Sequence, residues 1–258
     1  MNYIGIRGHR GAGKNTITYL LANTIEYLVK GKDILLFDKA FNEWCVSFRQ
    51  NEQLIDSLCC DHVIVEGFGD GPKMLLSMLT GISLQDMNSD YSKDHILVNL
   101  KDFSRAEVGE IDDEHIWTAA DYVGLHRWIA DEPAVLKEDT WMTLRELILY
   151  FGIYIMQNAF GRNVWVKSLI ANHTYYDSIF AKDNDYKIFN DIKAKSEITY
   201  IKDLGGVIIK VTRPGHRKNG GMDLLKGDNR FDYEVVIDGE LETLKDTILD
   251  IAQKIINL

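Results

Sequence analysis

The sequence has few cysteines, few prolines, no long apolar run and no excess of positive charge. Its three cysteines, Cys45, Cys59 and Cys60, have no zinc-binding spacing, and their odd number favours reduced thiols in a cytoplasmic protein. No apolar run reaches the length of a membrane span, and the N-terminus leads directly into an expected strand. We therefore expect neither a membrane span nor a signal peptide.

The chain carries 29 Lys and Arg against 39 Asp and Glu, which gives a formal net charge of −10 at pH 7. Surfaces that follow DNA or RNA are basic, so this charge disfavours nucleic acid as a partner. The seven histidines include no H-E-x-x-H pattern, so we expect no metal site built from protein ligands. A nucleotide site is compatible with an acidic chain, because it depends on local amides and a few cations.

Short apolar runs alternate along the chain with segments of helical periodicity. The expected strands are 3–8, 33–38, 62–67, 186–191, 206–212 and 233–238, and the expected helices are 14–30, 39–60, 72–80, 118–130, 143–157, 162–172, 195–204 and 240–256. This alternation predicts an α/β fold of the P-loop NTPase type, in which helices flank a mainly parallel sheet of about five strands. With three prolines and no low-complexity linker, the chain is expected to form a single domain. Helical insertions are expected within this domain. The candidate insertions are 31–61 and 87–115, the second of them an excursion from the main sheet, and 213–230 is a candidate lid or a solvated loop.

The first expected strand leads into Gly-His-Arg-Gly-Ala-Gly-Lys at residues 8–14, and an expected helix follows. The spacing G-x-x-x-x-G-K in this setting is typical of a phosphate-binding loop. Its glycines let successive N–H groups turn toward phosphate oxygens, the helix adds the positive end of its dipole, and the lysine reaches the outer phosphates. The alternative is a plain glycine turn with a solvated lysine. The candidate nucleotide-binding residues are Gly8, Gly11, Ala12, Gly13, Lys14, Asn15 and Thr16.

Four further segments resemble, in the same order, the deoxynucleoside monophosphate kinases of T-even and related phages. They are GFGDGPKMLLSMLTGI at 67–82, TLRELILYFGIYIMQNAFGRNVWVKSL at 143–169, IFNDIKAKSEITYIKDLGGVIIKVTRPG at 188–215 and RFDYEVVIDGELETLKDTI at 230–248. The resemblance implies a kinase of nucleotide metabolism that transfers the γ-phosphate of ATP, with Mg²⁺, to a deoxynucleoside 5′-monophosphate. It also implies small-molecule nucleotides as partners and a homodimer.

For the acceptor nucleotide, the resemblance implies two cations and a tryptophan near the base. Lys73 matches the family's monophosphate-binding segment, Arg145 its acceptor-phosphate arginine, and Trp165 its tryptophan. Each has a plain alternative as well: a solvated lysine, a surface ion pair and a core tryptophan. Lys39 is a rival for the role of Lys73. The substrate-binding candidates are Asp70, Lys73, Arg145, Gly152, Trp165 and Asp191.

On the donor side, the resemblance implies three residues around the end of the expected strand 186–191. Asp191 is expected to orient the acceptor or to hold Mg²⁺ through water, and Lys193 replaces the family's arginine at the donor phosphates. Glu197 matches an acidic residue of the nucleotide site, although a helix N-terminus favours a glutamate equally. Phosphoryl transfer needs alignment and charge neutralisation more than covalent chemistry. The expected catalytic residues are therefore Lys14, Arg145, Asp191 and Lys193.

The chain departs from the family at several of these positions. The family has G-K-D-T where this chain has G-K-N-T at 13–16, G-T where it has G-I at 152–153, and D-V-R where it has D-I-K at 191–193. A Ser or Thr hydroxyl after the loop lysine would normally help to hold Mg²⁺, and Asn15 offers a carbonyl oxygen instead. The family's lid element H-x-S-E is not recognisable.

Alternative functions therefore stay open. One is a P-loop kinase that acts on a modified nucleotide or on a base within DNA, and another is a nucleotide-binding protein without catalysis. A GTPase switch is disfavoured, because DLGG at 203–206 follows an expected helix and the chain has no N-K-x-D motif.

Overall fold

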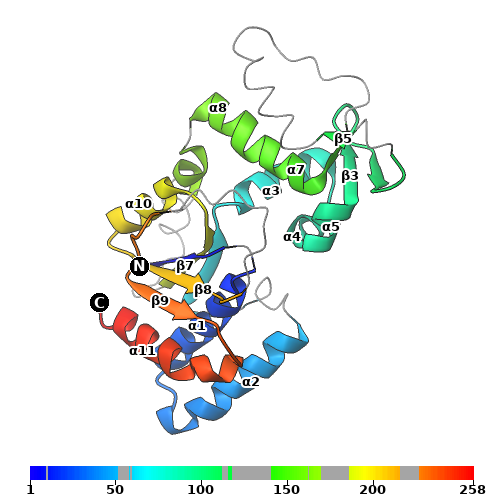
Figure 1. Cartoon of the computed structure of the whole chain (residues 1–258). Helices are drawn as coiled ribbons and strands as arrows, with labels where there is room; N and C mark the ends of the chain where they lie inside the picture. The colour runs from blue at the N-terminus through cyan, green and yellow to red at the C-terminus, as the bar shows by residue number, and fades with distance from the viewer. Residues whose placement is uncertain are drawn as a thin grey trace. The chain divides into compact units, whose positions relative to one another are not determined.

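The computed structural model describes residues 1–9, 11–51, 58, 60–111, 116–117, 141–161, 163–169, 186–215 and 227–258 (Figure 1). The chain divides into two compact units, one formed by Met1–Phe68 with Leu169–Leu258 and the other by Gly69–Ser168. Each unit is described below by itself. That both belong to the single kinase domain expected from the sequence stays a prediction.

The first unit contains a five-stranded parallel sheet in the order β2-β7-β1-β8-β9. The strands are β1 (Asn2–Arg7), β2 (Val63–Gly67), β7 (Tyr186–Ile192), β8 (Val207–Thr212) and β9 (Tyr233–Val236). In the central strands, Ile4 and Ile188 are side by side and fully buried, as expected for strands covered on both faces. The predicted fold class, a mainly parallel sheet flanked by helices, is confirmed.

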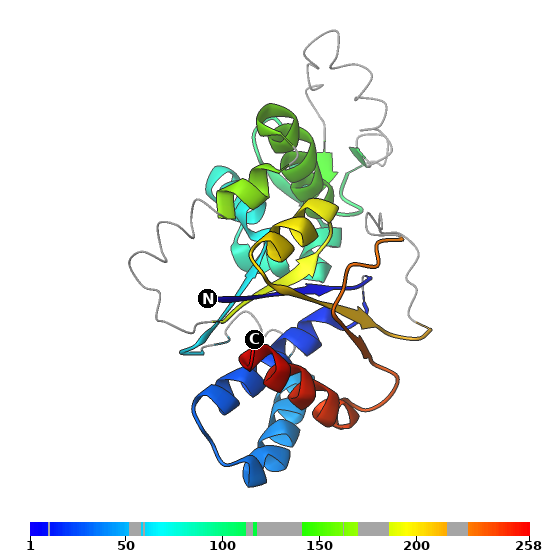
Figure 2. The same ribbon diagram turned by 90° about the vertical axis from the view of Figure 1, so that its left-hand side faces the viewer.

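Helices cover both faces of this sheet (Figure 2). On one side lie α1 (Lys14–Val29), α2 (Phe37–Gln50) and α11 (Lys245–Ile256), which follows the short helix η5 (Leu241–Leu244). On the other side α10 (Lys195–Asp203) packs against β1 and β8. The core between α1, α11 and the sheet is apolar and includes Ile6, Leu20, Ile209, Ile248 and Ile251.

The prediction of a strand at 33–38 is wrong, because this segment is helical. It forms the 3₁₀ helix η1 (Ile34–Leu36) and the first residues of α2. The side chain of Asp33 accepts a hydrogen bond from Leu35 N at 2.9 Å and caps this helical start. Further along, Phe37, Phe41 and Phe48 are buried at helical spacing, so the apolar run belongs to a helix that packs on α1. The expected helix 39–60 accordingly begins two residues earlier, and α2 ends at Gln50.

The second unit has its own four-stranded sheet in the order β4-β3-β6-β5, which the sequence analysis did not predict. Its strands are β3 (Ile96–Asn99), β4 (Arg105–Glu107), β5 (Ile116–Trp117) and β6 (Trp141–Thr143). Segment 87–115, expected to be an excursion from the main sheet, supplies β3 and β4. Strands of two to four residues are too short to show a periodicity in the sequence.

Helices complete the second unit around a core that includes Leu76, Met87, Val98 and Leu147. They are α3 (Asp70–Thr80), α4 (Leu84–Asn88), α5 (Asp90–His95), α7 (Leu144–Leu149), the π-helix η4 (Tyr150–Ile155) and α8 (Met156–Phe160). The expected helix 143–157 is thus divided by a π-helical turn. Residues 164–169 are also helical. The expected helix 118–130 lies outside the described residues.

A buried carboxylate joins α1 to the segment that leads into β2. Glu26 is 8% exposed and accepts hydrogen bonds from Asp61 N at 3.1 Å and from His62 N at 2.9 Å, and it pairs with Lys30 Nζ at 2.8 Å. Burial raises the pKa of Glu26, but the hydrogen bonds from Lys30 and His62 outweigh it and lower the pKa to about 2. The folded state therefore favours the ionised form of this residue.

We expect Glu26→Gln to lower the free energy of unfolding by about 2 kcal/mol at pH 7, because two partly buried N–H groups and Lys30 lose a charged acceptor. Since the folded pKa lies below the unfolded value, the contribution is complete above pH 4.5 and disappears as the pH falls toward 2. Urea unfolding of both proteins at a series of pH values measures this difference. Glu43→Gln, on the exposed face of α2, is the control and should change little. A difference between wild type and Glu26→Gln that stays constant from pH 6 to pH 3 would contradict this account.

Candidate active site

The glycine-rich loop (residues 8–13) connects β1 to α1, and its backbone needs glycine at particular positions. A Cβ at residue 8 would lie 2.6 Å from Val211 O, so the strand can approach only a glycine there. Gly11 and Gly13 have φ of 79° and 91°, in the left-handed region that glycine adopts without strain. Gly13 is the N-cap of α1, and a glycine has no side chain with which to cap the first amides. The N-terminus of this 16-residue helix is therefore suited to bind an anion.

Lys14 lies folded back over this loop. Its Nζ donates to Gly8 O at 2.9 Å and to His9 O at 3.0 Å, and it pairs with Asp191 Oδ1 at 3.1 Å. An ammonium group has three N–H donors, so these contacts use its full capacity. The side chain is only 11% exposed. Of the next two residues of α1, Asn15 is exposed and Thr16 is partly buried.

Asp191 reaches Lys14 because β7 contains an irregularity in its pairing with β1. The register runs from Gly5 with Phe189 to Arg7 with Ile192, so β7 has one residue more than β1 in this stretch. Asp191 has φ of 63°, and among the described residues only Phe103 shares a positive φ without being glycine. An extra residue of this kind bends a strand and redirects a side chain. Backbone strain of this sort is common at functional sites, and aspartate tolerates it better than most residues.

The carboxylate of Asp191 bridges two lysines. Besides Lys14, it pairs with Lys193 Nζ, which lies 2.6 Å from Oδ2 on a side chain that is 69% exposed. Burial raises the pKa of Asp191, but the charges of Lys193 and Lys14 outweigh it and hold the pKa at about 2. The group is therefore ionised at neutral pH and is a weak proton acceptor. Its chemical role is to position charges.

Glu197 makes the contacts of a helix cap. Its Oε2 accepts from Lys193 N at 2.7 Å and from Ala194 N at 2.9 Å, at the start of α10. Burial raises the pKa of Glu197, while these two N–H donors lower it in part. Through these bonds Glu197 holds the backbone that follows Asp191. A direct contact with a nucleotide stays a prediction.

In the second unit, the structure brings together the start of α3, Gly152 and Trp165. Trp165 Nε1 donates to Gly152 O at 2.7 Å. The indole ring lies against α3, where a Cβ on Gly71 would be 3.0 Å from the ring, and a Cβ on Gly152 would be 3.3 Å from Pro72. The glycines of both segments therefore allow a close approach between α3, the π-helix η4 and the tryptophan.

The two expected acceptor cations lie in the same unit, and each has acidic or amide partners. Lys73 Nζ donates to Asn88 Oδ1 at 2.9 Å and to Asp70 Oδ1 at 3.3 Å. Arg145 Nη2 donates to Asp94 Oδ2 at 3.0 Å, and its Nε donates to the other oxygen of the same carboxylate. Neither cation is simply solvated.

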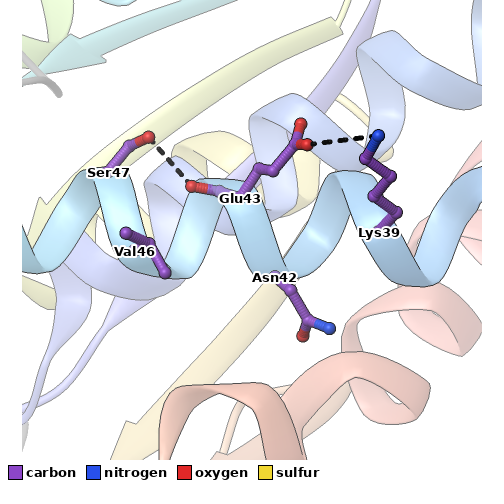
Figure 3. Close-up of a pocket in the computed structure, with 5 residues that line it drawn as sticks. All are labelled: Lys39, Asn42, Glu43, Val46 and Ser47. Atoms are coloured by element: carbon purple, nitrogen blue, oxygen red, sulfur yellow. Dashed lines mark hydrogen bonds and ion pairs between the residues drawn. The ribbon is translucent and has the colours of Figure 1, made fainter.

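Lys39, the rival for the acceptor phosphate, lies on the outer face of α2 beside a shallow depression (Figure 3). Its side chain is 80% exposed and pairs at 4.0 Å with Glu43, four residues later on the same helix. The depression is lined by Lys39, Asn42, Glu43, Val46 and Ser47. All five residues belong to α2, so this surface offers a single helix face with no second wall.

Asn88 and Asp94 were missed in the sequence because they lie in a polar segment of weak periodicity. Cap signals could have indicated the helices that carry them. Ser83 accepts from Asp86 N at 3.0 Å to begin α4, and Ser89 accepts from Ser92 N at 3.1 Å to begin α5. The greater part of the expected lid, residues 216–226, lies outside the described residues.

The first unit has a parallel sheet, a glycine-rich loop after the central strand β1, and a helix that begins at Lys14 directly after this loop. These features define an α/β protein of P-loop NTPase architecture. Within this class, the chain belongs to the deoxynucleotide monophosphate kinase family, whose model matches residues 3–248. The protein is therefore a phosphotransferase that acts on nucleotides. No curated protein matches the sequence. None of the described helices has the length and hydropathy needed to cross a membrane.

Proposed function

We propose that the protein transfers the γ-phosphate of ATP to a deoxynucleoside 5′-monophosphate and produces ADP and the diphosphate. The observation that carries this proposal is the contact between Lys14 and Asp191 at the N-terminus of α1, where the N-cap residue is a glycine. Amides and a lysine gathered at the end of the central strands are suited to the phosphates of a donor nucleotide. We place the reaction in the cytoplasm, and the homodimer stays a prediction from the resemblance.

On the donor side, a triphosphate would receive N–H groups from the glycine-rich loop and from the first turn of α1. Lys14 would exchange its bonds to the carbonyl oxygens of Gly8 and His9 for bonds to phosphate oxygens. Asp191 would keep the ammonium group near the loop during this exchange, because it holds Lys14 through an ion pair. Lys193, exposed and close by, would add a second positive charge as the γ-phosphate moves.

Magnesium fits the oxygen donors at this site. Mg²⁺ prefers carboxylate, hydroxyl and phosphate oxygens and keeps several waters, and Asp191 and Thr16 offer the first two of these. In the described part of the chain no three His, Cys, Asp or Glu side chains form a metal site of their own. We infer that Mg²⁺ arrives with ATP and neutralises phosphate charge when bound.

On the acceptor side, Lys73 and Arg145 would hold the monophosphate, with the base near Trp165. The attacking atom is a phosphate oxygen that has no proton to lose when the monophosphate is a dianion. The protein therefore needs no general base. It has to align two polyanions and offset their repulsion. We assign Lys14 and Lys193 to the donor and Lys73 and Arg145 to the acceptor for this task.

A coupled assay for ADP, with the four deoxynucleoside monophosphates, their ribose forms and 5-substituted pyrimidines, tests the proposal. We expect turnover with at least one free deoxynucleoside monophosphate and a dependence on Mg²⁺. Phosphate transfer to DNA, with no turnover of any free monophosphate, would promote the alternative acceptor. ATP binding without any transfer would indicate a protein that binds nucleotides only.

We expect Arg145→Ala to raise the KM for the monophosphate by about 30-fold, because a charge-assisted pair of hydrogen bonds contributes about 2 kcal/mol. The KM for ATP should change by less than about twofold, since Arg145 is assigned to the acceptor alone. Steady-state kinetics with each substrate varied in turn separates the two values. Arg105→Ala is the matched control, because Arg105 donates to Gly81 O in the same unit and has no assigned role. Equal increases in both KM values would contradict the assignment.

A further inference from the structure

Both cations of the candidate acceptor site are held by one short segment, Leu84–His95, which comprises α4 and α5. Asn88, the last residue of α4, accepts from Lys73 of α3. Asp94, on α5, accepts from both Nε and Nη2 of Arg145 of α7. The cations come from two different helices, and each has a partner in this one segment. Lys73 also contacts Asp70 of its own helix at 3.3 Å.

This segment is built to hold its side chains in place. Asp86 accepts from Ser83 Oγ at 2.7 Å and from Ser92 Oγ at 3.1 Å, which links the start of α4 to α5. Met87 is fully buried in the core of this unit, and α5 packs against α7. The side chains of Asn88 and Asp94 therefore extend from backbone that is anchored at several points.

We propose that Asp94 is a positioning residue for the acceptor phosphate, which acts by fixing the guanidinium of Arg145. The inference rests on the proposed function. A carboxylate that binds two N–H groups of one guanidinium sets its plane and direction, and a planar fork recognises phosphate only in a narrow range of orientations. Holding the fork in advance saves the entropy that a free arginine side chain would lose when the phosphate binds.

The negative charge of Asp94 also repels the incoming phosphate, and the two effects oppose each other. The side chain of Asp94 is 43% exposed, so solvent and salt screen this repulsion. The bidentate contact, by contrast, is short in range and is not weakened in the same way. We therefore expect positioning to outweigh repulsion. Asn88 supports Lys73 in the same sense, with a single hydrogen bond.

The test compares Asp94→Ala, Asp94→Asn, Asp94→Glu and Asn88→Ala in the coupled ADP assay. We expect Asp94→Ala to raise the KM for the monophosphate about tenfold, with a KM for ATP within twofold of wild type. Asp94→Asn keeps the shape and one acceptor oxygen, so its KM for the monophosphate should lie between those of wild type and Asp94→Ala. Asp94→Glu restores the charge and should also have a lower KM than Asp94→Ala. Asn88→Ala should raise the same KM by a smaller factor. Asp102→Ala, which removes a carboxylate from a turn of the same unit, is the control and should leave both KM values unchanged.

The double variant Arg145→Ala/Asp94→Ala makes the test specific. If Asp94 acts through Arg145, the double variant should be no worse than Arg145→Ala alone. Additive losses, an unchanged KM or a lower KM in Asp94→Ala would each overturn the inference, the last by showing that Asp94 competes with the phosphate. If Asp94→Ala does not fold, as judged by circular dichroism, Asp94→Asn decides by the same criteria. Wild-type protein that phosphorylates no monophosphate would instead overturn the proposed function, and this inference with it.

Discussion

Lys14→Ala is expected to lower kcat/KM by about 1,000-fold or more, because in the proposed function Lys14 supplies a cation to the moving phosphate. The free energy of unfolding should change far less, since Lys14 Nζ bonds to two loop carbonyl groups and to Asp191 and Lys14 is not one of the residues of the apolar core. The coupled ADP assay measures the first quantity and urea unfolding the second.

The matched control for this variant is Lys245→Ala. Lys245 is a lysine of the same unit that pairs with Asp38 at 2.8 Å on the surface, away from any assigned role. Its removal should leave turnover within twofold of wild type. Turnover near the wild-type level in Lys14→Ala would refute the phosphate-binding role of the glycine-rich loop.

Asp191→Asn is expected to lower kcat by about 100-fold, with a smaller change in the KM for either substrate. The substitution keeps the size of the side chain, and asparagine tolerates the positive φ at this position as aspartate does. It removes the charge that pairs with both Lys14 and Lys193, so the two ammonium groups lose the anion between them. The difference between Asn and Asp therefore measures the effect of that charge.

The pH dependence of the same variant gives a second measurement. Because the pKa of Asp191 is about 2 in the folded protein, below its ordinary value, the carboxylate stays ionised from pH 5 to pH 9. The ratio of wild-type to Asp191→Asn kcat should therefore be constant over this range. A ratio that rises with a midpoint near pH 6 would show that Asp191 acts as a proton acceptor, against the charge-positioning role. A kcat unchanged in Asp191→Asn would exclude both roles.

The main sheet could be predicted from the sequence because its strands are buried on both faces. Such strands appear as continuous apolar runs with turn residues at their ends, and five of the six expected strands end within two residues of the observed ones. Segment 33–38 has the same appearance but is helical. Whether this segment forms a strand or a helix depends on the cap at Asp33 and on the packing of Phe37 and Phe41. A single apolar run does not reveal either of these.

The candidate site likewise has one part that the sequence indicates and another that it does not. The glycine-rich loop is local in sequence, so its spacing alone indicates its backbone and the position of Lys14. The contact between Lys14 and Asp191 depends on one extra residue in β7, and no periodicity signals such an irregularity. The pair of Asp94 with Arg145 joins residues that are 51 positions apart, in a segment without helical spacing long enough to be recognised.

The sequence by itself determined the architecture of the parallel sheet, the loop that follows its first strand and the family resemblance. These depend on local residue order: apolar runs, glycine spacing and ordered motifs. Only the tertiary structure decided that Asp191 turns toward Lys14 and that Asn88 of α4 and Asp94 of α5 contact Lys73 and Arg145. Each of these contacts joins side chains whose relative positions are set by the packing of separate elements. The free energy of that packing depends on the whole folded chain, so no short stretch of sequence indicates it.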